Sequence, residues 1–276
     1  MASDTKVSVV VLTYRPQMLV ELKENLASTI GVEYELVVID NSRKEYTSIA
    51  VAYNEGAARS TSPYIAFVHE DVRFKTQGWG ALALQHMAED DRIGLIGVIG
   101  SKFKSYQVTG HPNSIEEQRF KCGTVNAPPR ILKAEDRRRE PVVCVDGLFL
   151  FSRCSIIGSS PFDVSVVKGF HGYDMDLSLT THFGGSEVVV AHDISVDHFS
   201  RGHRNMDWYL TNRLISRKWS RHLPTISRDV HVTKWELFRL ELKTIFWLVG
   251  KNRIKNLLKV PLWTVRFLLR PRSLSR

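Results

Sequence analysis

Short apolar runs alternate with amphipathic stretches over the first 200 residues of the chain. The runs are rich in β-branched residues and predict strands over Val7–Thr13, Tyr34–Asp40, Tyr64–Val68, 93–100 and Glu187–Ala191. Between them, apolar positions at helical spacing predict helices over 17–28, 46–59, 78–90 and 174–182. This alternation predicts an α/β fold, with a mainly parallel sheet covered by helices on both faces. Ligands bind such sheets at the carboxyl ends of the strands, where Asp40 and Asp71 fall.

Residues 101–141 break this alternation. They contain several prolines and a run of three arginines, so we predict an irregular insertion that forms a loop over the site. The apolar pattern resumes over residues 142–151, a predicted strand with Gly147 inside it. A glycine within a strand often marks the close approach of a ligand or of another backbone.

The last part of the chain carries the net charge. Residues 231–276 contain 11 Lys or Arg and two Asp or Glu, while the whole chain has a net charge of +9, so residues 1–230 are neutral. From about residue 233, aromatic, aliphatic and basic positions recur at helical spacing and predict a basic amphipathic helical tail. Such a helix suits an anionic membrane surface. A helix packed on the preceding domain, or one that binds a partner, fits the same pattern.

The composition excludes several classes of protein. Apolar residues make up 43% and charged residues 24% of the chain, which excludes collagen-like, coiled-coil and disordered chains. Its three cysteines fit neither a disulfide framework nor a zinc ribbon, so we expect a reducing, cytoplasmic environment. We expect no signal peptide and no membrane span, because no apolar run approaches about 18 residues. A neutral body without an RNA-binding motif argues against a nucleic-acid partner.

Six motifs are informative as an ordered set. They are VVVLTYRP at 9–16, VVIDNS at 37–42, YNEGAARSTSPYIAFVHEDV at 53–72, VDGLFLFSR at 145–153, GYDMDLSL at 172–179 and VDHFS at 196–200. In this order, over residues 7–200, the chain resembles the family 2 glycosyltransferases. The resemblance implies the GT-A fold, a Rossmann-like α/β sheet sandwiched by helices. We therefore predict a catalytic domain over residues 1–230, followed by the helical tail that the charge pattern indicates over residues 231–276.

The resemblance implies a nucleotide site at the ends of the first strands. The carboxylate that matches Asp40 binds the nucleobase or the ribose in the family, although Asp-Asn-Ser is also a turn-forming sequence. The other candidates near the nucleotide are Thr13, Tyr14, Arg15, Asn54, Gly56, His69 and Glu70. For Asn54 and Gly56, packing of the helix is an equal alternative.

His69-Glu70-Asp71 stands where the family carries its Asp-x-Asp motif. The resemblance therefore implies that Asp71 binds Mn²⁺ or Mg²⁺, which neutralises the diphosphate. His69 departs from the motif, and it would contact the sugar or a phosphate or favour Mn²⁺, which tolerates imidazole nitrogen. His198 stands where many GT-A enzymes place a further metal ligand.

The resemblance also assigns a catalytic base. Asp174 matches the carboxylate that accepts the proton of the acceptor hydroxyl, while Tyr173 replaces the glutamate that usually precedes it. A helix N-cap is the alternative role for Asp174. Asp176 is expected in the first turn of the helix, behind the site, and Arg201 and His203 are candidates for contacts with the diphosphate.

Together these residues imply a metal-dependent, inverting glycosyltransferase. Its donor would be a nucleotide-diphosphate sugar, with a UDP-sugar favoured, and its acceptor a glycan or a lipid-linked molecule, as in surface polysaccharide synthesis. The tail would hold it at the inner face of the cell membrane. The alternative is a nucleotide-sugar-binding protein with weakened or lost catalysis, because both acidic motifs are altered.

Overall fold

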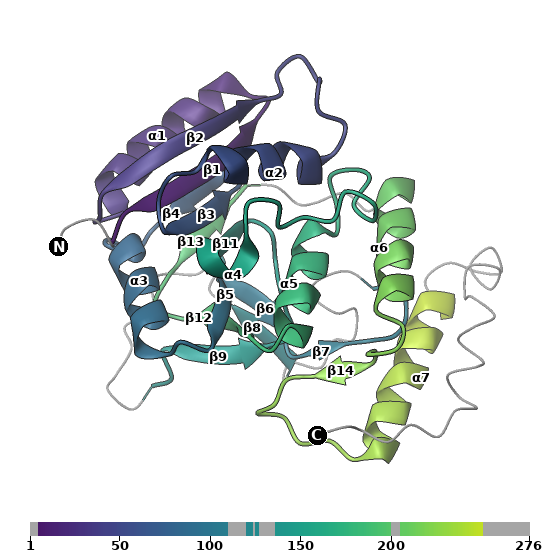
Figure 1. Ribbon diagram of the computed structural model, residues 1–276. Coiled ribbons are helices and arrows are strands. Elements are labelled where there is room, and N and C mark those ends of the chain that lie inside the picture. Colours follow the sequence, from purple (N-terminus) through teal and green to yellow (C-terminus); the bar gives the residue numbers. More distant parts are fainter. Residues whose placement is uncertain (1–4, 110–119, 124, 127–135, 200–204, 251–276) are drawn as a thin grey trace.

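The computed structural model describes residues 5–109, 120–123, 125–126, 136–199 and 205–250. A seven-stranded sheet forms the centre of this part (Figure 1). In order across the sheet, its strands are β2 (Tyr34–Asp40), β1 (Val7–Thr13), β3 (Tyr64–Val68), β11 (Phe149–Arg153), β5 (Ile93–Gly97), β12 (Glu187–Ala191) and β9 (Arg139–Val142). All except β11 and β9 run in one direction, which confirms the mainly parallel sheet.

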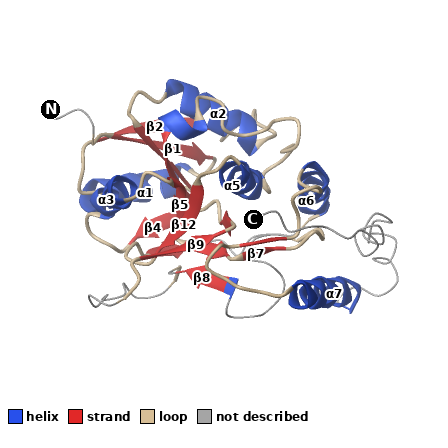
Figure 2. Ribbon diagram, turned by 60° about the horizontal axis from the view of Figure 1, so that its bottom comes forward, coloured by secondary structure: helices blue, strands red, loops and turns tan. Residues whose placement is uncertain are grey.

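Helices cover both faces of the sheet (Figure 2). One face packs against α1 (Pro16–Thr29) and α3 (Trp79–Glu89), and the other packs against α2 (Ile49–Arg59) and α5 (Tyr173–Phe183). Side chains of β1 alternate between the two layers: Val9 and Val11 face α1 and α3, whereas Val10 and Leu12 face α2 and α5. Because both layers are apolar, β1 is an apolar run that only Ser8 interrupts before Thr13.

The register of the first strands fixes where the site lies. β1 pairs with β2 from Val7 opposite Tyr34 to Thr13 opposite Asp40, and β3 pairs with the other side of β1. The carboxyl ends of these three parallel strands therefore meet at one edge of the sheet. The residues that follow β1 and β3 lie at this edge, as does the carboxylate that ends β2.

The strands predicted over β1, β2, β3 and β12 have the bounds that the sequence indicates, and the four predicted helices agree to within three residues. Two longer predicted strands are wrong. The run at 93–100 divides into β5 and β6 (Ile99–Ser101), and the run at 142–151 divides between β9, β10 (Cys144–Val145) and β11. In both runs the chain leaves the main sheet, and β10 pairs with β6 in a second sheet. The apolar residues continue from one sheet into the other, so the sequence does not show where one strand ends and the next begins.

The predicted irregular insertion also needs correction. The described part of 101–141 contains β7 (Phe103–Lys104), β8 (Lys121–Gly123) and most of β9. β8 extends the second sheet, whose order is β10-β6-β8, and β7 pairs with β14 (Thr225–Ile226). Strands this short, paired with distant segments, leave no periodic pattern in the sequence. A loop over the site would fall on residues outside the described part.

Two further helices lie after residue 204 in the described part of the chain. α6 (Met206–Lys218), which the sequence pattern did not predict, begins at Asn205, whose side chain accepts a hydrogen bond from the backbone N–H of Trp208. α7 (Lys234–Gly250) begins with a capping box, in which Thr233 and Glu236 exchange side-chain to backbone hydrogen bonds. Both helices lie on the side of the molecule that carries β7 and β14 (Figure 1).

One face of α7 is packed on the domain. Leu240, Glu241 and Thr244 are buried, whereas Trp235 and Phe246 are 66% and 71% exposed. Residues 234–246 of the predicted tail therefore form a helix with a docked face and an exposed aromatic face, and residues 251–276 lie outside the described part. None of the described helices is both long and apolar enough to span a bilayer.

Candidate active site

Two connections bring the predicted metal ligands together. His69-Glu70-Asp71 forms the turn between β3 and β4 (Val72–Phe74), and β13 (Val196–His198) pairs antiparallel with β4 so that His198 lies opposite Val72. His198 thus lies beside Asp71 although it is far away in the sequence. The pairing of two three-residue strands creates this part of the site.

The side chains of His69, Asp71 and His198 converge. The Asp71 Oδ1 atom lies 3.4 Å from His198 Nε2 and 4.0 Å from His69 Nδ1, and one ligand atom from each residue lies within 4.8 Å of the others. His198 Nε2 is buried and makes no hydrogen bond in the described structure. A buried nitrogen without a hydrogen bond, aimed at a carboxylate and a second imidazole, is the arrangement expected of a cation site.

The donor set fits a divalent transition metal. Two imidazoles and one carboxylate suit Mn²⁺ and its neighbours in the first transition row better than Mg²⁺, which prefers oxygen ligands. Burial lowers the pKa of His69, so its ring is neutral near pH 7. Burial raises the pKa of Asp71, but the neighbouring His198, His69 and Arg15 outweigh it and lower that pKa to about 2. Both residues are therefore in the protonation state that binds a metal.

Tyr173 orients the imidazole of His69. Its hydroxyl lies 2.5 Å from His69 Nε2, which leaves Nδ1 on the side of Asp71. Burial keeps the pKa of Tyr173 well above its usual value, so it remains a neutral phenol. A hydrogen bond to the second ring nitrogen commonly fixes a ligating histidine. His69 and Tyr173, the two residues that depart from the family motifs, are thus in contact.

Asp174 lies on the first turn of α5 but does not cap it. The N-cap is Gly172, which has φ 78°, and the Asp174 Oδ2 atom accepts a hydrogen bond of 3.1 Å from the backbone N–H of Gly147. A Cβ on Gly147 would overlap the Tyr173 hydroxyl. The predicted close approach at Gly147 is therefore made by a side chain, in a turn between β10 and β11 and not within a strand.

Glu70 organises the loop that follows β1. Its carboxylate accepts hydrogen bonds from Thr13 Oγ1 (2.6 Å), from the backbone N–H groups of Tyr14 and Arg15, and from Arg15 Nε (2.8 Å). The Arg15 guanidinium also reaches Asp71 at 3.4 Å. Glu70 is 3% exposed, so in this structure it holds the predicted nucleotide-binding residues Thr13, Tyr14 and Arg15 in place.

The other predicted nucleotide residues divide into two groups. Asp40 is exposed at the end of β2, where a hydrogen bond from the Ser42 backbone N–H lowers its pKa. Asn54 instead bonds through both amide atoms to the backbone of Phe162. Gly56 permits contact between α2 and β1, because a Cβ there would overlap Val10. Asp40 is thus exposed at the site edge, whereas Asn54 and Gly56 hold α2 in place.

Asp176 faces away from the ligand cluster, which consists of His69, Asp71 and His198. Its two oxygens accept hydrogen bonds from Lys218 Nζ and Trp219 Nε1, each at 2.8 Å, and it is 2% exposed. It therefore ties α5 to the end of α6. Arg201 and His203 lie outside the described residues.

Sequence reasoning missed two contributors to the site. Asp146 lies close enough to His69 and His198 to oppose in part the lowering of the pKa of each imidazole by burial, and its own carboxylate accepts a hydrogen bond from the backbone N–H of Leu148. Tyr173 was noted only as a departure from a motif. The signal for Asp146 was its Asp-Gly pair directly after an apolar run, which is typical of a turn at a strand end.

Solved structures share this fold. A TarS structure from S. aureus (residues 1–349) matches with a TM-score of 0.53 and 14% identity, over 93% of this chain and 76% of that one. The structure of GalNAc-T7 with UDP, GalNAc and Mn²⁺ matches with a TM-score of 0.54 and 11% identity, over 98% of this chain and 59% of that one. No curated protein matches the sequence.

The fold and the family match define the class as a glycosyltransferase with the GT-A fold. The family model described as "Glycosyltransferase like family" matches residues 12–217, three-quarters of the chain. The chain belongs to this glycosyltransferase-like family.

Proposed function

We propose that the protein is a metal-dependent, inverting glycosyltransferase that moves a sugar from a nucleotide diphosphate to a hydroxyl of a glycan or of a lipid-linked acceptor. The observation that carries this proposal is a continuous chain of contacts from the metal-ligand cluster to Asp174, the proposed base. The His69 imidazole is hydrogen-bonded to the Tyr173 hydroxyl. The next residue, Asp174, accepts a hydrogen bond from Gly147, which lies beside that hydroxyl. Phosphate neutralisation and proton transfer would thus take place side by side.

The residues of the chain divide the chemistry among them. Asp40 and the loop Thr13–Arg15 would bind the nucleoside, with Glu70 holding the loop. His69, Asp71 and His198 would hold a divalent cation, which when bound neutralises the charge of the diphosphate leaving group. Asp174 would accept the proton of the attacking hydroxyl on the side of the sugar opposite the leaving group, which inverts the anomeric carbon.

The donor and the metal are supported by known relatives. TarS has been crystallised with UDP and with UDP-GlcNAc, and GalNAc-T7 with UDP and Mn²⁺, so UDP is the first nucleotide to test. The two imidazoles of the cluster support Mn²⁺ over Mg²⁺. We also propose a peripheral position at the inner face of the cell membrane, supported by the exposed Trp235 and Phe246 and by the basic sequence after residue 250.

Titration calorimetry with UDP, in Mn²⁺, Mg²⁺ or EDTA, tests the metal site. We expect the tightest binding in Mn²⁺, and Asp71→Asn should remove the difference between Mn²⁺ and EDTA. Asp174→Asn should bind UDP and Mn²⁺ normally yet slow sugar transfer or donor hydrolysis by about 10²–10⁴-fold, the usual contribution of a general base.

Two results would contradict the proposal. UDP binding of equal affinity in EDTA and in Mn²⁺ would exclude a metal-dependent donor site. Metal-dependent UDP binding without hydrolysis of any nucleotide sugar would favour the alternative, a nucleotide-sugar-binding protein without catalysis. Normal turnover in Asp174→Asn would move the role of base to another carboxylate.

A further inference from the structure

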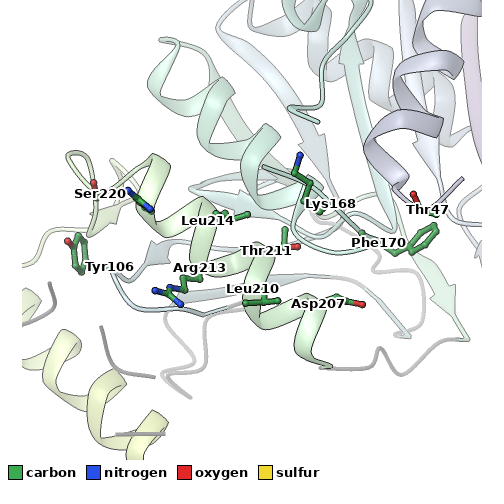
Figure 3. Close-up of a pocket in the computed structure, with 12 residues that line it drawn as sticks. Thr47, Tyr106, Lys168, Phe170, Asp207, Leu210, Thr211, Arg213, Leu214 and Ser220 are labelled. Atoms are coloured by element: carbon green, nitrogen blue, oxygen red, sulfur yellow. The ribbon is translucent and has the colours of Figure 1, made fainter. Parts of the chain in front are cut away.

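A pocket of about 890 Å³ lies beside α6 (Figure 3). Its walls are one side of α6 and the segment 168–170, which leads into α5, and Thr47, Tyr106 and Ser220 complete the lining. This volume is typical of sites for small molecules. None of the nucleotide or metal residues lines it.

Cations dominate the polar lining of the pocket. Lys168, Arg213 and Arg217 are opposed by one carboxylate, Asp207. Arg213 and Arg217 lie one turn apart on α6, are exposed, and form no salt bridge with any carboxylate in the described part of the chain. Two arginines one helical turn apart, without a carboxylate partner among the described residues, are suited to a phosphate.

A column of exposed apolar side chains runs beside these cations. Leu210 and Leu214 on α6 are 47% and 38% exposed, and Phe170 across the pocket is 38% exposed. Met206, one turn before Leu210, is 58% exposed and continues the column. Figure 3 shows Leu210, Arg213 and Leu214 on the same helix. An apolar column beside a cationic one matches a molecule with a phosphate and a hydrocarbon chain.

The pocket adjoins the helix that carries the proposed base. The α6 residues Thr211 and Ile215 pack on Gly172, where an added Cβ would lie 3.0 Å from Thr211 Cγ2 and 2.6 Å from Ile215 Cδ1. Gly172 is the N-cap of α5, two residues before Asp174. The wall of the pocket thus contacts the backbone that positions Asp174.

We infer that this pocket binds the acceptor and that the acceptor is a lipid linked through phosphate. Arg213 and Arg217 contact the phosphate, and Leu210, Leu214 and Phe170 contact the first part of the hydrocarbon chain. The inference rests on the proposed function, because only a transferase has an acceptor. It adds to that function the chemistry of the acceptor and the place where it binds.

Farnesyl diphosphate serves as a probe that carries both features. Its affinity is measured by calorimetry in EDTA, so that the diphosphate cannot bind through a metal. We expect it to bind at least about tenfold more tightly than inorganic pyrophosphate or farnesol. The paired variants Arg213→Gln with Arg217→Gln, and Leu210→Ser with Leu214→Ser, should each weaken binding by at least about tenfold.

Matched surface variants control for general effects. Arg59→Gln on α2 and Val20→Ser on α1 change an exposed arginine and an exposed valine elsewhere, and both should bind the probe as the wild type does. The pocket variants should keep Mn²⁺-dependent UDP binding. If UDP fails to bind the wild type, the proposed function fails, while the probe result still reports on the pocket.

Three outcomes would overturn the inference. Pyrophosphate could bind as tightly as farnesyl diphosphate, which would leave the apolar column without a role. Both paired variants could bind the probe as the wild type does. Vesicles of phosphatidylglycerol could bind through the same side chains while the probe does not, and the pocket would then be part of a membrane contact and not an acceptor site.

Discussion

At the residue scale, two departures from the expected motifs compensate each other. His69 replaces the first aspartate of one motif and Tyr173 replaces the glutamate of another, and the structure places them in contact. An imidazole needs a partner on its second nitrogen to present the first one in a fixed direction. The phenol supplies this partner, so the altered motifs form a coherent pair and not two separate losses.

Tyr173→Phe tests this pairing. The fold should remain, because the ring keeps its packing against Tyr53 and Phe162. Loss of the hydroxyl should weaken Mn²⁺-dependent UDP binding by about 10–100-fold, the usual effect of removing a group that orients a metal ligand. Tyr53→Phe removes a hydroxyl from the same aromatic cluster and is the control. Equal metal affinity in the two variants would show that Tyr173 serves only packing.

At the element scale, a single glutamate ties three strands together. Glu35 on β2 accepts hydrogen bonds from Ser8 on β1 and from Thr61 and Ser62, which precede β3. Burial raises the pKa of Glu35, but these hydrogen bonds outweigh it and lower that pKa to about 2. This contact lies at the end of the strands opposite the site, so it supports the register that aligns Thr13 with Asp40.

Glu35→Gln should lower the free energy of unfolding by about 1–2 kcal/mol at pH 7, because hydrogen bonds to an ionised group are lost. The folded-state pKa is depressed, so this contribution is complete above pH 4.5 and is lost as the pH falls towards 2. Urea unfolding of the wild type and of Glu35→Gln should show a smaller difference in the free energy of unfolding at pH 3 than at pH 7. Glu33→Gln, at an exposed ion pair with Lys6, is the control. A difference in the free energy of unfolding that does not change with pH would contradict the role of the ionised carboxylate.

At the scale of the whole molecule, the C-terminal segment has two parts with different expected roles. α7 buries Leu240, Glu241 and Thr244 on the domain, and Glu241 Oε1 accepts a hydrogen bond from the backbone N–H of Tyr106. Residues 251–276 contain eight Lys or Arg and no Asp or Glu. The first part completes the fold, and the second holds most of the charge that would attract an anionic membrane.

Two truncations separate these roles. Ending the chain at residue 230 should lower the unfolding temperature by several degrees, because it uncovers Phe103 and Phe120, which pack with Leu240. Ending it at residue 250 should leave that temperature unchanged but abolish most binding to anionic liposomes in a sedimentation assay. Liposome binding retained after truncation at 250 would locate the membrane contact on α7 or elsewhere.

The sequence alone determined the elements whose pattern is local. β1, β3 and β12 have their predicted bounds because a strand buried on both faces is a nearly uninterrupted apolar run, and β2, at the sheet edge, is marked by its apolar residues 36–39. It also gave the candidates for the chemistry, since Asp40 ends a strand, Asp71 follows one and Asp174 lies at the start of a helix; their roles stay predictions. The order of the six motifs was sufficient to identify the family.

Only the tertiary structure decided which of these residues meet. The pairing of β13 with β4 brings His198 to Asp71, and the turn at Gly147 brings a backbone N–H to Asp174. It also showed that Asn54 and Asp176 bond to other parts of the fold in place of facing the ligand cluster. The physical reason is that the same type of polar side chain can either bind a ligand or form a hydrogen bond that stabilises the fold. Their partners are set by contacts between distant segments, which no local pattern records.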